Sequence, residues 1–231
     1  MEQNKNVHDI LIDIKNLTRG YPESPNILFH KFNFGLYKND FCVVMGKSGV
    51  GKSTLVKFII GDIKVPLRTV YHKREDLGRY SDRELQQYRR KIWIVFQDYR
   101  LMEDLTVREN VVYPLKLYEV GHEIVDRKFN TLKNKLNLHD LQHLPVKFLS
   151  GWEKQKVAIA RSLIHDPDFI IADEPTGNLD WEHTQQIADI LLESHALGNT
   201  VLLITHDIHL LEYLKYKQES QEENKLRIHQ L

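Results

Sequence analysis

Residues 41–53, FCVVMGKSGVGKS, decide the fold of this chain. The apolar run 41–45 predicts a buried strand, and the residues that follow the loop, TLVKFII over 54–60, predict a helix. The loop between them fits Gly-x-x-x-x-Gly-Lys-Ser/Thr in the strand-loop-helix context that this pattern requires. A glycine-rich turn beside a surface lysine is the alternative, and it does not explain why all three parts agree.

The spacing of this loop suits a polyphosphate. Glycines let several backbone N–H groups point at one anion, and the positive end of the following helix adds to the attraction. We expect Lys52 to reach the β- and γ-phosphates and the Ser53 hydroxyl to ligate Mg²⁺. The predicted phosphate-binding residues are Gly46, Lys47, Ser48, Gly49, Val50, Gly51, Lys52, Ser53 and Thr54.

Length, charge balance and cysteine content limit which classes of protein this chain can belong to. The 231 residues are enough for one core, or for one core with a smaller lobe. The 32 basic residues equal the 32 acidic ones, so no overall field favours nucleic acid or an anionic membrane, and no nucleic-acid partner is expected. The single cysteine, Cys42, excludes disulfides within the chain and suits a reducing cytoplasm.

Membrane attachment is expected only through a partner. Residues 1–6 lack the apolar core of a signal peptide. No stretch approaches the roughly 20 apolar residues that span a bilayer.

The residues before the glycine-rich loop are predicted to be β-structure. Residues 10–17 and the alternating stretch 27–37 are the candidate strands. Between them, Tyr21 lies in a turn with Gly20 and Pro22. Its ring could stack on an adenine, and the alternative is packing beside the proline.

A second predicted site residue follows a later strand. Residues 81–90 are expected to form a helix with Ser81 as N-cap and Glu84 completing a capping box. The strand 92–96 then ends at Gln97, whose amide could meet Mg²⁺ or the attacking water. The alternative is a polar residue that faces solvent.

The middle of the chain is predicted to be helical, because apolar residues recur there at helical spacing and strand-like runs are few. We expect Pro114 and Pro145 to break its helices. At its end Ser150 is a candidate N-cap, and the helix that starts at Gly151 offers N–H groups to an anion. Most Ser-Gly helix starts bind nothing, so this signal is weak alone.

Two adjacent carboxylates end the apolar run 169–172. Burying them without partners would be costly, so a metal or a water network is expected there. Asp173 is predicted to hold Mg²⁺ and Glu174 to polarise the water that attacks the γ-phosphate. The strand 200–205 delivers His206, which could bind phosphate or orient that water.

Together these motifs resemble the nucleotide-binding domain of ABC ATPases, in the family's order and over nearly the whole chain. The resemblance implies an α/β fold: a P-loop NTPase core with a mixed sheet flanked by helices, an N-terminal antiparallel β portion and an inserted α-helical subdomain. The core would comprise about 1–97 and 162–231, and the helical subdomain about 98–161.

The resemblance also implies a homodimer that forms on ATP binding. One copy would contribute Tyr21 and the phosphate loop, together with Gln97, Asp173, Glu174 and His206, to each ATP and its Mg²⁺. Ser150 and Gly151 of the other copy would close over the γ-phosphate. Asp180, in the turn-rich loop 175–180, would couple the two sites.

More narrowly, residues 95–101 (VFQDYRL) and 173–180 (DEPTGNLD) resemble the FtsE family of cell-division ATPases. This implies an ATPase at the inner face of the cell membrane, held by an integral partner of the FtsX type. That partner would dock beside Gln97, around Tyr99, Leu101, Met102 and Tyr113. The alternatives are the ATPase of a lipoprotein-releasing or macrolide-export-like transporter, and an ATP-binding switch that hydrolyses little.

One residue departs from the ABC pattern. The family usually has a second glycine after Leu-Ser-Gly, whereas this chain has Trp152. The backbone N–H is kept, but the indole needs room in a place where related proteins have no side chain. The sequence therefore predicts that closure is slower or needs the partner.

Overall fold

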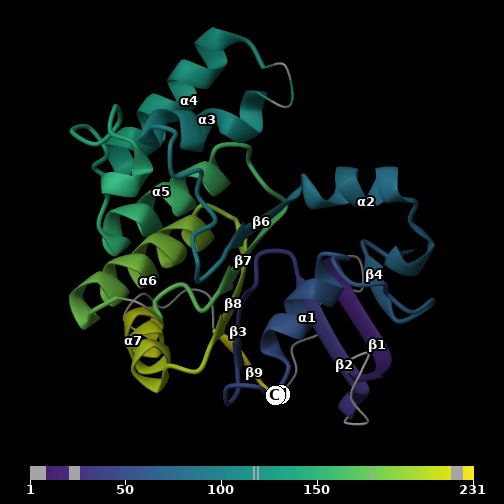
Figure 1. The fold of residues 1–231 in the computed structure, drawn as a ribbon. Coiled ribbons are helices and arrows are strands. Elements are labelled where there is room, and N and C mark those ends of the chain that lie inside the picture. The colour runs from purple at the N-terminus through teal and green to yellow at the C-terminus, as the bar shows by residue number, and fades with distance from the viewer. Residues whose placement is uncertain (1–8, 21–26, 117, 119, 178, 220–225) are drawn as a thin grey trace.

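A computed structural model describes residues 9–20, 27–116, 118, 120–177, 179–219 and 226–231. The described chain is an α/β structure with two sheets and seven α-helices around them (Figure 1), so the predicted α/β fold is confirmed. The strands are β1 (Ile10–Gly20), β2 (Ile27–Tyr37), β3 (Phe41–Met45), β4 (Val70–His72), β5 (Glu75–Asp76), β6 (Ile92–Val95), β7 (Phe169–Asp173), β8 (Thr200–Thr205) and β9 (Arg227–Gln230). The helices are α1 (Lys52–Ile59), α2 (Asp82–Arg89), α3 (Val107–Lys116), α4 (His122–Lys135), α5 (Gly151–Leu163), α6 (Trp181–Ala196) and α7 (Ile208–Glu219).

The central sheet is parallel, with strand order β6-β7-β8-β3-β9. Strand β9 was not predicted. Because the strands run in one direction, their carboxyl ends lie at one edge of the sheet. The phosphate loop, Gln97, Glu174 and His206 follow four of these strands, so the topology gathers them at that edge.

The N-terminal antiparallel portion forms a sheet of its own, with strand order β2-β1-β4-β5. This sheet and α1 enclose one hydrophobic core against one face of the central sheet. A second core joins the opposite face to α3–α7. Alternate residues of β3 enter the two cores: Val43 and Met45 the second, Cys42 and Val44 the first.

The middle of the chain is helical, as predicted, with α3, α4 and α5 in contact with one another. Pro114 does not break a helix: it lies inside α3, which continues to Lys116. The turn around it buries Val111, Val112 and Leu115. This packing offsets the hydrogen bond that a proline removes.

No helix in the described part of the chain is both long enough and apolar enough to cross a membrane.

Candidate functional site

The phosphate loop adopts a backbone that its glycines make possible. Gly49 and Gly51 have φ angles of 82° and 111°, in the left-handed region. Gly51 also faces the ring of Phe29, which a Cβ atom would approach to 3.1 Å. Helix α1 begins at Lys52 without a side-chain cap. Its first N–H groups are therefore available to an anion.

Lys52 is buried, and its ammonium group has three oxygen neighbours. Its Nζ atom donates to the carbonyl oxygens of Gly46, at 2.7 Å, and Lys47, at 3.1 Å. It also lies 3.3 Å from Oε1 of Glu174. A buried cation needs such partners. The loop and the acidic strand end are thereby joined through one side chain.

Glu174 is held from the other side by the end of β8. Its Oε1 atom lies 2.8 Å from Nδ1 of His206, and its Oε2 atom accepts hydrogen bonds from Thr205 Oγ1 and the His206 backbone N–H. Its φ angle is 48°, an uncommon conformation for a side chain of this size. The structure thus brings Lys52, Glu174 and His206 into one cluster. Sequence reasoning missed Thr205, although it precedes a predicted site residue.

The three predicted Mg²⁺ ligands, Ser53, Gln97 and Asp173, line one cavity of about 550 Å³. Asp173 Oδ1 is buried there without a hydrogen-bond partner. Burial raises the pKa of the Asp173 carboxyl, and a hydrogen bond with Ser53 opposes the shift. A hydroxyl, an amide oxygen and an unsatisfied carboxylate are hard oxygen donors. The donor set fits Mg²⁺.

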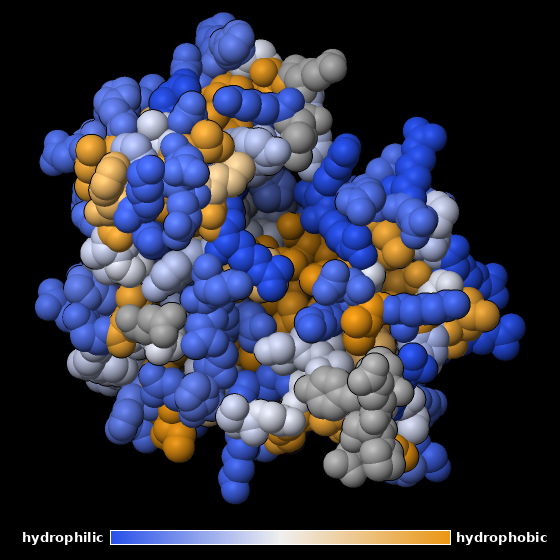
Figure 2. All heavy atoms as spheres, in the orientation of Figure 1, coloured by the Kyte–Doolittle hydropathy of each residue, from blue (hydrophilic) through white to orange (hydrophobic). Residues whose placement is uncertain are grey.

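The shape of this region also depends on Gly177. A Cβ atom at Gly177 would lie 2.8 Å from Nε2 of Gln97. The Gln97 amide therefore packs on the loop that follows Glu174, and a side chain at Gly177 would displace it. Figure 2 shows a hollow near β6, with hydrophobic residues on its floor and hydrophilic residues around it.

The remaining predicted residues lie elsewhere. Ser150 caps α5 through a capping box with Glu153, and Gly151 faces the Tyr99 hydroxyl. Asp180 caps α6 by accepting a hydrogen bond from the His183 N–H. None of Ser150, Gly151 and Asp180 lines the cavity around Asp173. Tyr21 lies outside the described residues.

Two side chains of α5 that the sequence did not single out hold the neighbouring loops. Arg161 donates to the carbonyl oxygens of Tyr99, at 2.9 Å, and Arg100, at 2.6 Å. Gln155 is fully buried and donates to the Pro175 carbonyl at 2.6 Å. Such contacts have no sequence signal, because they join residues 20 to 62 positions apart.

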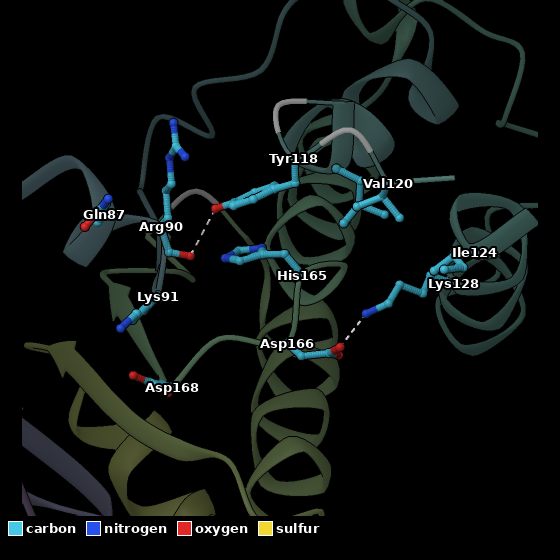
Figure 3. Close-up of a pocket in the computed structure, with 11 residues that line it drawn as sticks. Gln87, Arg90, Lys91, Tyr118, Val120, Ile124, Lys128, His165, Asp166 and Asp168 are labelled. Carbon is cyan, nitrogen blue, oxygen red and sulfur yellow. Dashed lines mark hydrogen bonds and ion pairs between the residues drawn. The ribbon is translucent and has the colours of Figure 1, made fainter. Parts of the chain in front are cut away.

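A larger cavity of about 630 Å³ lies between the C-terminal ends of α2 and α3, α4 and the segment before β7 (Figure 3). Arg90 and Lys91 lie on one side of it, and Lys128 on the other is paired with Asp166. Tyr118 spans toward Arg90, with its ring 5.3 Å from the guanidinium. Lys91 precedes β6, so this cavity is near the amino ends of the strands. It is distinct from the cluster at their carboxyl ends.

Known proteins resemble this chain in sequence and in fold. The sequence matches the ABC transporter family over residues 29–177. It is 36% identical to the cell division ATP-binding protein FtsE of Haemophilus influenzae over 202 residues, covering 87% of this chain and 93% of the relative. It is 34% identical to FtsE of Bacillus subtilis over 208 residues, 89% of this chain and 90% of the relative.

Two solved structures similar to this chain are ATP-binding cassettes. One is a dimer in a post-hydrolysis state bound to ADP and Pi, with a TM-score of 0.78, 31% identity and coverage of 89% of this chain and 92% of that one. Another is a dimeric bacterial ABC transporter cassette, with a TM-score of 0.79, 30% identity and coverage of 95% and 94%. The chain therefore belongs to the ABC transporter family and is an ATP-binding cassette similar to FtsE.

Proposed function

We propose that this chain binds ATP with Mg²⁺ and hydrolyses it, as the ATPase subunit of an FtsEX-like membrane complex in bacterial cell division. The observation that carries the proposal is the cluster of Lys52, Glu174 and His206. It lies beside the unsatisfied oxygen of Asp173, and its Lys52 stands at the end of the glycine-rich loop.

Each residue of the cluster has a role that its contacts support. Lys52, already surrounded by oxygens, binds the β- and γ-phosphates. Glu174 takes a proton from the attacking water, and His206, bonded to its Oε1 atom, keeps that carboxylate in place. Ser53, Gln97 and Asp173 would hold Mg²⁺, which supplies positive charge against the triphosphate when it is bound.

We further propose that two copies of the chain enclose the nucleotide. The solved relatives named above are dimers, which supports this assembly. Ser150 and Gly151 of the second copy would close over the γ-phosphate, Asp180 would lie between the two sites, and Tyr21 would stack on the adenine. The helical subdomain, proposed as residues 98–161, would carry the start of α5 with it during closure.

The membrane partner, of the FtsX type, is proposed to hold the chain at the inner face of the membrane. It would dock near Gln97 and the helical subdomain, where Tyr113 of α3 exposes 41% of its surface and Leu101 and Met102 are half-buried. An apolar surface at the hollow beside β6 suits a segment of another protein.

A steady-state ATPase assay of the parent and Glu174→Gln tests the catalytic part of this proposal. We expect the substitution to lower turnover about 100-fold or more, since a general base contributes about 10² to 10⁴. Dimerisation driven by MgATP should persist or strengthen. Negligible and equal turnover in both proteins, with ATP-driven dimerisation intact, would instead indicate a binding switch.

Co-purification from membranes tests the partner. An FtsX-type protein bound to the chain would support the division complex. A lipoprotein-releasing or macrolide-export-like subunit in its place would assign the chain to a transporter.

A further inference from the structure

The indole of Trp152 packs against side chains of its own chain. It lies against the imidazole of His183 in the first turn of α6, with ring centroids 4.8 Å apart and an interplanar angle of 34°. The ammonium group of Lys156, one turn further along α5, lies 5.3 Å from the centre of the same indole. The ring therefore joins the start of α5 to the start of α6.

His183 also contacts Asp180. Its Nδ1 atom lies 2.8 Å from Asp180 Oδ1, and its backbone N–H donates to the same oxygen at 2.9 Å. Asp180 ends the loop 175–180. The other end of that loop, Pro175, accepts the hydrogen bond from Gln155 of α5. Both ends of the loop are thus tied to the first two turns of α5.

We propose that Trp152 and His183 are positioning residues that fasten the described ends of this loop, residues 175–177 and 179–180, to the start of α5, so that these parts move as one body. The inference rests on the proposed function, in which these are the two parts that one copy presents to the other. Fastening them before closure removes the cost of ordering the loop during closure.

This inference changes the effect expected of a glycine at position 152. From the sequence, the indole was expected to hinder closure. In the structure it packs on α6 of the same chain, so its removal loosens the loop and should weaken closure. A phenylalanine keeps an aromatic ring on His183 and should preserve most of the effect.

A double-mutant cycle tests the pair. Trp152→Gly, His183→Ala and the double variant are made in the Glu174→Gln background, which retains bound ATP, and the dimer dissociation constant is measured with MgATP by sedimentation. We expect each single substitution to weaken the dimer by about threefold to tenfold, the range of an aromatic ring contact. The dimer dissociation constant of the double variant should be no higher than that of the more severely affected single variant, because both substitutions remove the same contact.

The matched control is His209→Ala. His209 also contacts a tryptophan, Trp181, with ring centroids 6.3 Å apart, but it is not tied to Asp180 or α5 by the contacts described above. We expect it to leave the dimer constant unchanged. Trp152→Phe should stay within about twofold of the parent.

Hydrogen exchange of the chain without nucleotide gives an independent readout. Trp152→Gly and His183→Ala should both speed exchange in residues 175–183, while ATP affinity measured at concentrations too low for dimerisation stays the same. The inference would be overturned by unchanged exchange rates in both variants or by a tighter dimer in Trp152→Gly. It would also be overturned if the fold-changes in the dimer dissociation constant of the two single variants multiply in the double variant. A parent that fails to bind MgATP overturns the proposed function instead, and the exchange result still decides whether the pair fastens the loop.

Discussion

Asp173 places ligand binding and stability in opposition. Its carboxyl is buried, and the pKa is raised, so between its ordinary value and the raised value the folded chain holds a proton that the unfolded chain releases. Stability therefore falls as pH rises through that window, and the charged form at neutral pH is unfavourable until a cation binds. Under the proposed function, Mg²⁺ bound at Asp173 would offset this cost, which the nucleotide-free protein bears alone.

We expect Asp173→Asn to raise the melting temperature of the nucleotide-free protein at pH 7, because it removes the buried charge. The same substitution should raise the Mg²⁺ concentration needed for half-maximal turnover more than about tenfold. Thermal unfolding and a Mg²⁺ titration of ATPase activity measure the two effects. A lower melting temperature would show that the carboxylate is already neutralised in the folded chain.

The lowered pKa of His72 makes the stability of the chain depend on pH. Burial, assisted by the charge of Lys73, lowers its pKa from 6.5 to about 4. The unfolded chain therefore binds more protons between these values, so stability is complete above about pH 6.5 and is lost as pH falls toward 4. We expect this residue alone to remove about 2 kcal/mol of unfolding free energy between pH 7.5 and pH 5.

Urea unfolding at the two pH values checks this prediction. His72→Phe should reduce the difference by about the same amount, since phenylalanine can keep the ring contact with Tyr88, at 4.7 Å between centroids, and has no proton to bind. His165 and His229 also have pKa values lowered by burial and remain in the variant. An unchanged difference would contradict the assignment to His72.

At the scale of elements, helices α2 and α5 begin with the same kind of capping box, although only α5 is proposed to contact a second copy of the chain. Ser81 caps α2 and Ser150 caps α5, each in a capping box with a glutamate three residues on. We expect Ser81→Ala and Ser150→Ala each to lower the unfolding free energy by about 1 kcal/mol, measured by urea titration. Only Ser150→Ala should also weaken ATP-driven dimerisation, so Ser81→Ala is its matched control.

Equal dimerisation in the two serine variants would show that α5 does not contribute its start to a second copy. The comparison is informative because both serines use their hydroxyl groups in the same intrachain bonds. The loss of the cap is therefore common to both variants.

At the scale of the whole molecule, the partner surface is predicted to lie on the helical segment. We expect Tyr113→Ala to lower recovery of the membrane partner about tenfold or more, as truncation of a central interface aromatic does, while ATPase activity without the partner is unchanged. Tyr216 of α7 is also exposed, at 70%, and Tyr216→Ala is the control that should keep the partner. Quantitative co-purification from membranes measures the recovery of the partner with each variant. Equal recovery with both variants would show that the partner does not bind at α3.

Much of the fold followed from local pattern. The glycine-rich loop, the apolar strands and the capping serines depend on residues that are close in sequence, so their spacing alone predicts them. Strand β9 was missed because it is short and its partner, β3, lies far back in the chain. Pro114 misled the helix prediction because packing in α3 outweighed a local preference.

The sequence by itself determined which groups stand at the ends of the strands: a glycine-rich loop, a glutamine, two carboxylates and a histidine. Only the tertiary structure decided that Lys52 and His206 hold Glu174 between them, that Asp173 keeps one oxygen unsatisfied, and that Trp152 lies on His183. The order of residues along a strand or helix is local information. Which side chains meet depends on how separate strands and helices pack, and that packing is settled by the whole chain at once.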